Sequence, residues 1–355
     1  MVNPERYPII LLMLLMLLCG YSASAQSTDA PLTSQEIVRL VYQLPKNPGL
    51  RDEIIKEIRR RGIGFPLTDG LRGVVATKSG NDALLRRTLE EAERRRLNPT
   101  ASTLPPEAET TDLLEKTRTV TLAAAGAMPD FVVKELITRS TALGNTQNWR
   151  VSDHLSVAVS YRANAGEEYK LLAVNGQRPN DANLGYWQVG GSTSAGEFVS
   201  LLAMIFSEKS QTSFHALDTD TLRNRRTIVY EYSVKKELSS LRIEWDKRGV
   251  IAGYHGRIWI DRETNRVLRL EEITTEMPAD FPITEARWLI DYDWVSIAER
   301  QYLLPMQAEV ITTARLGEQI YQKRNAIRFR GYQKFGSEVK LIEEDEFEEE
   351  PEKKP

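Results

Sequence analysis

Pairs of acidic residues are the first feature of this sequence whose type and spacing could do chemistry. Asp291 and Asp293 stand two residues apart in a run rich in aromatic and aliphatic residues, so a strand would place both on one face. Two neighbouring carboxylates could bind a cation or share a proton, and hydrolases can be built on such a pair. The alternative interpretation is a solvated outer face of the strand. Two further pairs are adjacent in sequence: Glu167/Glu168 and Glu271/Glu272.

A glycine-rich stretch and three histidines lack the patterns of known sites. Residues 191–196 have the glycine spacing of a phosphate-binding loop, but Glu197 follows where such a loop carries lysine. We interpret this stretch as a turn followed by a helix cap. His154, His215 and His255 are far apart, and none has the nearby second ligand that a metal site requires. The sequence therefore predicts no catalytic residue, no metal ion and no cofactor.

Residues 1–25 have the pattern of a signal peptide. An apolar run over 8–18 is followed by Ala23-Ser24-Ala25, the small-x-small pattern that signal peptidase recognises. The run is shorter than the roughly 20 residues that a membrane-spanning helix needs. We expect cleavage after Ala25 and a periplasmic or extracellular protein with no transmembrane span in its mature chain; an uncleaved N-terminal anchor is the alternative. Cys19, the only cysteine, would leave with the peptide.

The C-terminal residues 343–355 carry eight acids and two lysines, a net charge of −6. Such a block is typical of a solvated, disordered tail. Without it the formal charge of −3 becomes about +3, which is too small to indicate a polyanionic partner. We therefore expect no nucleic-acid partner.

Residues 32–97 are predicted to form a small basic helical domain. The apolar spacing indicates one helix after the Thr33–Glu36 capping box and three more near 50–61, 68–78 and 81–97. The segment holds 14 basic and 9 acidic residues, an excess of five positive charges. Its two arginine triplets, Arg59–Arg61 and Arg94–Arg96, have two interpretations: a footprint on an anionic lipid or cell-wall polymer, or solvated helix ends that suit the helix dipole.

Residues 98–111 are rich in proline, threonine and acid, and they are predicted to be a linker. An amphipathic helix near 112–125 follows. From Phe131 onward, apolar residues alternate with polar ones, which is typical of strands. We predict nine to eleven strands in an antiparallel meander, within a domain spanning 112–338. A capping-box pattern at Ser194–Glu197 predicts one further helix over 194–207, apolar on most sides and therefore buried.

Two stretches of the strand series resemble a known family. Residues 254–271 (YHGRIWIDRETNRVLRLE) resemble a hairpin of periplasmic proteins of the lipoprotein-carrier superfamily, and 302–310 (YLLPMQAEV) resemble the strand that often follows it. That superfamily includes the Lol-type outer-membrane lipoprotein-sorting proteins and the envelope-stress regulators that share their fold. The resemblance implies an α+β fold: a strongly curved antiparallel sheet, an unclosed barrel, with helices across its concave face, here preceded by the small helical segment.

A concave apolar face is suited to a lipid or an acylated peptide, because such ligands bind by burial, at roughly 0.8 kcal/mol per methylene, without a signature residue. The leading hypothesis is thus a non-catalytic exported binding protein for an apolar ligand. An interaction module with an envelope protein partner is the second hypothesis, and an envelope hydrolase using carboxylates is the third. The candidate cavity residues, which could equally fill an ordinary core, are Phe198, Leu201, Leu202, Ile205, Phe206, Trp245 and Trp259.

Overall fold

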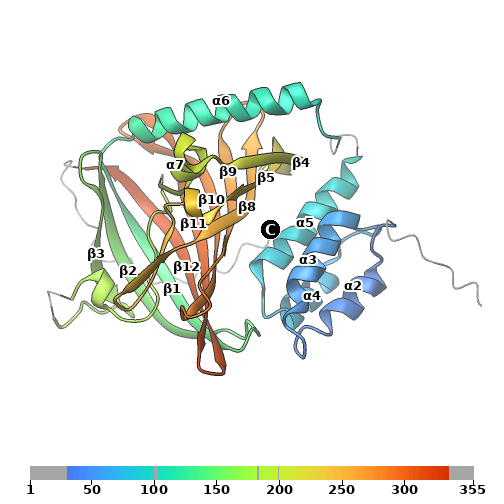
Figure 1. Cartoon of the computed structure of the whole chain (residues 1–355), viewed down its shortest axis with the longest axis horizontal. Coiled ribbons are helices and arrows are strands. Elements are labelled where there is room, and N and C mark those ends of the chain that lie inside the picture. Colours follow the sequence, from blue (N-terminus) through green and yellow to red (C-terminus); the bar gives the residue numbers. More distant parts are fainter. Residues whose placement is uncertain (1–29, 100–102, 182–183, 199, 336–355) are drawn as a thin grey trace, which may run out of the picture.

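The computed structural model describes residues 30–99, 103–181, 184–198 and 200–335 (Figure 1). The predicted signal peptide, with Cys19 and its cleavage site, and the predicted acidic tail lie outside the described residues. None of the helices in the described part is long and apolar enough to cross a membrane.

Four helices form the N-terminal part of the described chain. They are α2 (Ser34–Val41), α3 (Leu50–Arg61), α4 (Asp69–Lys78) and α5 (Ala83–Leu97). The predicted capping box is confirmed: the Thr33 side chain accepts from the Glu36 backbone, and the Glu36 carboxylate accepts from the Thr33 backbone N–H at 2.8 Å. Gly62, with φ +67°, ends α3 as the arginine–glycine pattern predicts. These helices share one hydrophobic cluster.

The rest of the described chain is mainly an antiparallel sheet with two α-helices, α6 (Glu107–Gly126) and α7 (Ser200–Phe206), and three short 3-10 helices. Ten strands pair in the order β3-β2-β1-β12-β11-β10-β9-β8-β5-β4, and β6 pairs only with β7. The twelve strands are β1 (Phe131–Leu143), β2 (Arg150–Arg162), β3 (Gly166–Val174), β4 (Ser213–Leu222), β5 (Arg225–Val234), β6 (Arg242–Trp245), β7 (Arg248–Ile251), β8 (Gly253–Asp261), β9 (Val267–Thr275), β10 (Ile283–Ile297), β11 (Arg300–Leu316) and β12 (Gln319–Lys334).

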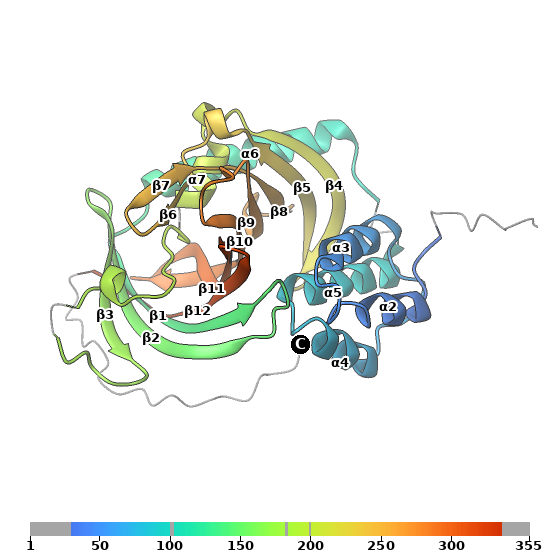
Figure 2. The ribbon, with the colours of Figure 1, turned by 60° about the horizontal axis from the view of Figure 1, so that its bottom comes forward.

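The sheet is curved and unclosed, with β3 and β4 at its two edges (Figure 2). The expected antiparallel pairing is confirmed, but the expected single meander is wrong, and the described residues form twelve strands where nine to eleven were expected. The first strand β1 pairs with the last strand β12, and the chain crosses from one edge to the other between β3 and β4. Pairing partners so far apart in sequence leave no local pattern, so strand periodicity could not show them.

The two faces of the sheet pack against different helices. Along β10, Trp288 and Ile290 belong to the large cluster that also contains α7, whereas Leu289 belongs to the cluster of the helical domain. We call the first surface the α7 face and the second the helical-domain face. Figure 1 shows α2–α5 beside the sheet and α6 lying across its end, above α7.

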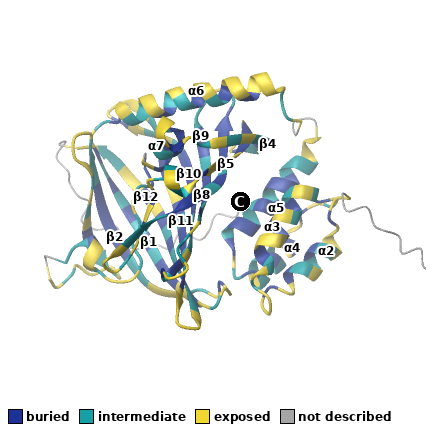
Figure 3. Ribbon diagram, in the orientation of Figure 1, coloured by how far each residue is buried: buried dark blue, intermediate teal, exposed yellow. Residues whose placement is uncertain are grey.

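Helix α6 begins at Glu107, inside the predicted linker, and turns one side toward the sheet. Its buried residues recur at helical spacing and its outer side is exposed (Figure 3). Hydrogen bonds fix it to the strands: the Tyr230 hydroxyl donates to the Thr110 carbonyl at 2.6 Å, and the Arg266 guanidinium donates to the Val120 carbonyl at 2.7 Å.

Helix α7 is shorter than the sequence predicts. The helix expected over 194–207 begins at Ser200, and the predicted capping box at Ser194–Glu197 does not form because this stretch is not helical. Gly196 has φ +89°, a left-handed value that interrupts a right-handed helix, and the Glu197 side chain is buried in the protein. The apolar residues expected to be buried are buried, on seven residues of helix and the turn before it.

Candidate functional site

A cavity of about 200 Å³ lies on the α7 face, between α6, α7 and the β10–β11 hairpin. Phe198 and Leu202 line it from α7 and the turn before α7, Ala124 lines it from α6, and Trp294 and Leu303 line it from the hairpin. Most of its lining side chains are apolar. Arg266 is the only charged residue among the described residues that line it, and its guanidinium is bonded to α6. The cavity can therefore accept an apolar group.

The predicted cavity residues divide into two groups. Phe198 and Leu202 line the cavity, whereas Leu201, Ile205 and Phe206 are buried in the surrounding cluster. The Phe206 ring stacks on the Phe214 ring of β4 with centroids 5.5 Å apart. All five side chains are buried, so the two groups differ in what they contact and not in their exposure.

The two predicted tryptophans lie elsewhere. Trp245, on β6, is half-buried against the edge of the same cluster, with the Lys323 ammonium 5.4 Å from its ring centre. Trp259 is a correction: it lies on the helical-domain face, because its neighbours Ile258 and Ile260 occupy the α7 face of β8. Its indole N–H donates to Asp220 at 3.1 Å, so it cannot form a wall of the cavity.

Three carboxyl groups lie near the start of α7 without a lysine or arginine partner among the described residues. Glu135 on β1 and Glu197 are fully buried, and neither forms an ion pair within the described chain. Glu167 on β3 accepts from the Tyr169 hydroxyl at 2.6 Å and from the Gly196 backbone at 3.2 Å, so it ties the turn before α7 to the sheet. Burial raises the pKa of Glu197 to about 7, and burial together with the neighbouring Glu197 and Glu167 raises the pKa of Glu135 well above its usual value.

A fourth carboxyl group of this kind, Glu272, lies further along the α7 face. The Tyr232 hydroxyl donates to it at 3.1 Å, and no arginine or lysine of the described residues pairs with it. Burial raises the pKa of Glu272 to about 8, so it is largely protonated at neutral pH. Sequence reasoning missed these four carboxyl groups as a set. In their strands, Glu135, Glu167 and Glu272 occupy positions that the apolar alternation assigns to the buried face. A carboxyl group at such a position was the signal that could have identified them.

The helical-domain face carries the opposite arrangement, in which acids pair with arginines across the domain interface. Bidentate hydrogen bonds join Arg94 to Asp220 at 2.7 and 2.8 Å, and Arg59 pairs with Glu271 at 2.7 Å. Arg95 pairs with Asp218. Both interpretations of the arginine triplets are therefore wrong for these three residues, because their side chains turn inward to acids of the sheet. The basic excess of residues 32–97 is partly neutralised by the strands that these helices cover.

Asp291 lies at the centre of this interface. It is buried and accepts from Arg87 at 2.9 Å, from Arg269 at 2.7 Å and from Gln307 at 2.8 Å. The two guanidinium groups hold the pKa of Asp291 well below its usual value against the effect of burial. The solvated-face interpretation is therefore wrong for Asp291, and so is its pairing with Asp293, which lies further out near Arg223.

The other two acidic pairs also separate. Glu271 and Glu272 are adjacent on β9, so they point to opposite faces, one toward Arg59 and the other toward Tyr232. Glu167 is turned to α7, whereas Glu168 is exposed. Within the described residues no group of three or more acidic, histidine or cysteine side chains has the geometry to hold a metal ion.

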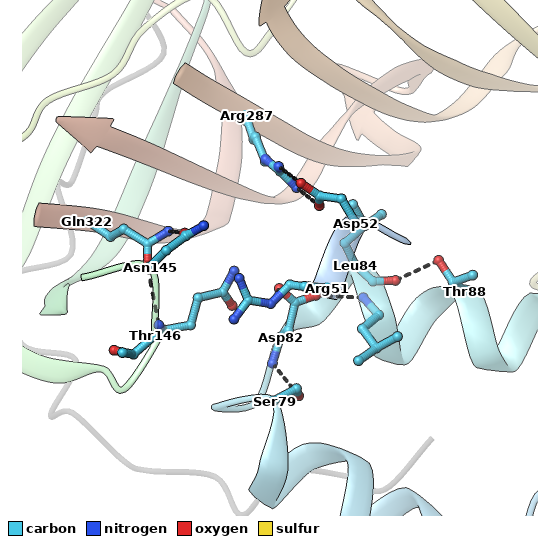
Figure 4. Close-up of polar contacts among 12 residues, drawn as sticks. Arg51, Asp52, Ser79, Asp82, Leu84, Thr88, Asn145, Thr146, Arg287 and Gln322 are labelled. Atoms are coloured by element: carbon cyan, nitrogen blue, oxygen red, sulfur yellow. Dashed lines mark hydrogen bonds and ion pairs between the residues drawn. The ribbon is translucent and has the colours of Figure 1, made fainter. Parts of the chain in front are cut away.

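A second and larger cavity, of about 310 Å³, lies between the helical domain and the sheet. At one side Arg287 of β10 points to Asp52 of α3, with hydrogen bonds of 2.8 and 2.7 Å, and Arg51 lies 3.0 Å from Asp82 (Figure 4). The sequence did not indicate this cavity, because the residues that line it come from segments far apart in the chain.

Comparisons with known proteins give distant structural matches. No family model matches the sequence, and no curated protein matches it. A DUF1329 family protein from Desulfovibrio piger aligns with a TM-score of 0.28 and 8% identity, over 64% of this chain and 93% of that chain. The Pseudomonas aeruginosa MucA/MucB complex and a structure of MucB with MucA(peri) align at TM-scores of 0.18 and 0.17, each at 9% identity over 62% of this chain and 98% of that chain. TM-scores this low establish neither a shared fold nor a shared function.

Proposed function

We propose that this protein is a non-catalytic, exported binding protein that holds an apolar ligand, such as a lipid chain or an acylated peptide, on the α7 face of its sheet. The observation that carries the proposal is the apolar cavity of about 200 Å³ between α6, α7 and the β10–β11 hairpin. Two residues that the sequence singled out, Phe198 and Leu202, form part of its wall.

The cavity is smaller than the 300–1,000 Å³ typical of small-ligand sites, so it would hold one end of a ligand rather than the whole molecule. An engineered apolar cavity of roughly 150 Å³ already binds benzene. Each buried methylene would add roughly 0.8 kcal/mol. A longer chain would need α7 to shift, and α7 is suited to this because it has only seven residues and follows the left-handed Gly196.

Two adjacent alanines of α6 offer a matched test. Ala124 lines the cavity, whereas Ala123 is exposed and does not. Ala124→Leu would fill part of the cavity without introducing a charge, and Ala123→Leu makes the same change outside it. We expect the neutral fluorescent probe N-phenyl-1-naphthylamine to bind the unmodified protein and to bind Ala124→Leu at least tenfold more weakly, with Ala123→Leu unchanged.

Fluorescence titration of the mature chain checks this expectation, and melting curves confirm that both variants are folded. Equal binding by both variants, or no binding by the unmodified protein, would contradict an apolar site at this place.

The open sheet edges favour the second candidate function, a protein-interaction module. Strands β3 and β4 each have a single neighbour in the sheet, so their outer backbone groups could pair with an extended segment of a partner. A proline that removes an outward N–H from β3 would abolish such binding and leave probe binding intact.

A further inference from the structure

The larger cavity, on the helical-domain face, has walls of two kinds. Its apolar wall contains Ile55 and Leu84 from the helices and Leu289 and Ile311 from the strands. Its other wall carries charged side chains from α3, β5, β8 and β9. The volume of about 310 Å³ and the position between two domains are both typical of small-molecule sites.

Most acids that line this cavity already have a cation. The pairs are Asp52 and Glu285 with Arg287, Asp82 with Arg51, Glu271 with Arg59, and Glu309 with Arg324 at 3.9 Å. Glu272 also borders this cavity, but its side chain points to the opposite face of the sheet, toward Tyr232. The side chains that remain without an ion pair are Lys56, His255 and Arg257 on the basic side and Glu231 on the acidic side. Because Arg287 serves both Asp52 and Glu285, the acids and bases of this set nearly balance, and the distinctive feature is that a half-buried cation, Arg257, is left without an ion pair.

Arg257 is the most informative of these residues. It lies on β8 directly opposite Glu231 on β5 and Glu271 on β9, yet its guanidinium makes no hydrogen bond or ion pair with any described residue. Glu271 is instead taken by Arg59 at 2.7 Å. Burial, with a contribution from the nearby Arg59, lowers the pKa of Arg257, although the carboxylates of Glu271, Glu91 and Glu231 act in the opposite direction. A half-buried guanidinium without a partner is costly, and a planar or tetrahedral oxyanion satisfies it with two parallel hydrogen bonds.

We propose that this interdomain cavity binds the oxyanion head of a small amphipathic molecule, a carboxylate or a phosphate, and that Arg257 is the main side chain that contacts this head. Lys56, exposed at the edge of α3, adds a second positive charge, and the short apolar part lies against Ile55, Leu289 and Ile311. This site is on the opposite face of the sheet from the apolar cavity, and it does not depend on the function proposed above.

Calorimetric titration of the mature protein with four probes tests the proposal: octanoate, octyl phosphate, 1-octanol and inorganic phosphate. We expect octanoate or octyl phosphate to bind at least tenfold more tightly than 1-octanol. Arg257→Gln should weaken binding of that anionic probe at least tenfold, since hydrogen bonds to a charged group are lost. The matched control is Arg242→Gln, which changes an exposed arginine on the separate β6–β7 hairpin.

The result that overturns the proposal is equal affinity of Arg257→Gln and the unmodified protein for the anionic probes, or no binding of either anion. Inorganic phosphate binding as tightly as octyl phosphate would overturn the apolar part of the assignment. Ala124→Leu should leave all four affinities unchanged, so the failure of the apolar site on the α7 face and the failure of this site are distinguishable. Arg257→Gln is expected to fold, because its guanidinium forms no hydrogen bond or ion pair with a described residue; its melting curve checks this.

Discussion

The two faces of this one sheet treat buried acids in opposite ways. On the helical-domain face, Asp220, Asp291 and Glu271 are each paired with an arginine of the helical domain. On the α7 face, Glu135 and Glu272 are equally buried and have no cation in the described chain. Burial of a charge is costly unless it is paired, so the pKa of Asp291 is lowered by its arginines, whereas burial raises the pKa of Glu135 and of Glu272.

The comparison shows what each surface is built for. Paired charges fix the orientation of two parts of a chain, because each arginine must meet its own acid. Protonated carboxyls let a surface remain largely uncharged, which suits an apolar cavity. The two faces should therefore respond to pH with opposite signs, and the paired charges should respond to mutation according to how deeply they are buried.

The largest expected effect is on the paired face. Asp291→Asn would leave Arg87 and Arg269 buried without their shared carboxylate, and breaking a buried ion pair costs about 3–5 kcal/mol. Urea denaturation should show this loss of unfolding free energy. The matched control, Asp293→Asn, removes a half-exposed acid 3.7 Å from Arg223 and should cost under about 1 kcal/mol. Equal losses in both variants would contradict the central role of Asp291.

The paired face also predicts the direction of acid denaturation. The pKa of Asp291 is depressed in the folded protein, so its contribution is present above the unfolded value of about 3.9 and is lost as pH falls through the lower folded value.

The next effect is on the unpaired face and has the opposite sign. The pKa of Glu272 is raised to about 8, so between pH of about 4.3 and 8 the folded protein holds a proton that the unfolded chain has released. Stability should therefore fall as pH rises through this window, by up to about 1.4 kcal/mol per pH unit for such a group. Glu272→Gln should flatten this decline, and Glu263→Gln, at an exposed position, should not. Unfolding free energies at pH 5, 6, 7 and 8 would show it; parallel profiles in all three proteins would count against a protonated Glu272.

The smallest effect is at the rim of the interface. Asp52 is largely exposed, and its partner Arg287 also pairs with Glu285, so Asp52→Asn should cost under about 1 kcal/mol. The difference from the unmodified protein should shrink in 1 M salt, where the screening length is about 3 Å. A larger loss that salt leaves unchanged would show that this pair behaves like the buried ones.

Local patterns in the sequence predicted the elements better than their arrangement. The Thr33–Glu36 box and the arginine–glycine end of α3 involve contacts three or four residues apart, so the sequence reveals them. Strand alternation likewise indicated that Ile258 and Trp259 point to opposite faces, but not which face the α7 cluster would occupy. That choice depends on packing between distant segments.

The candidate site shows the same limit. Phe198 and Leu202 were identifiable because they are apolar in a buried segment. Arg94 and Arg95 looked like a helix end, because their partners Asp220 and Asp218 lie more than a hundred residues away. The α7 prediction failed at Gly196, since a capping-box pattern does not reveal a left-handed backbone within it.

Native mass spectrometry of residues 26–355, purified from a bacterial periplasm without detergent, tests the central claim most directly. We predict adducts of lipid mass that are lost on organic extraction, are diminished in Ala124→Leu and persist in Ala123→Leu. A clean apo mass that stays unchanged after incubation with phospholipid or acylated peptide would contradict an apolar-ligand site and would favour the interaction module.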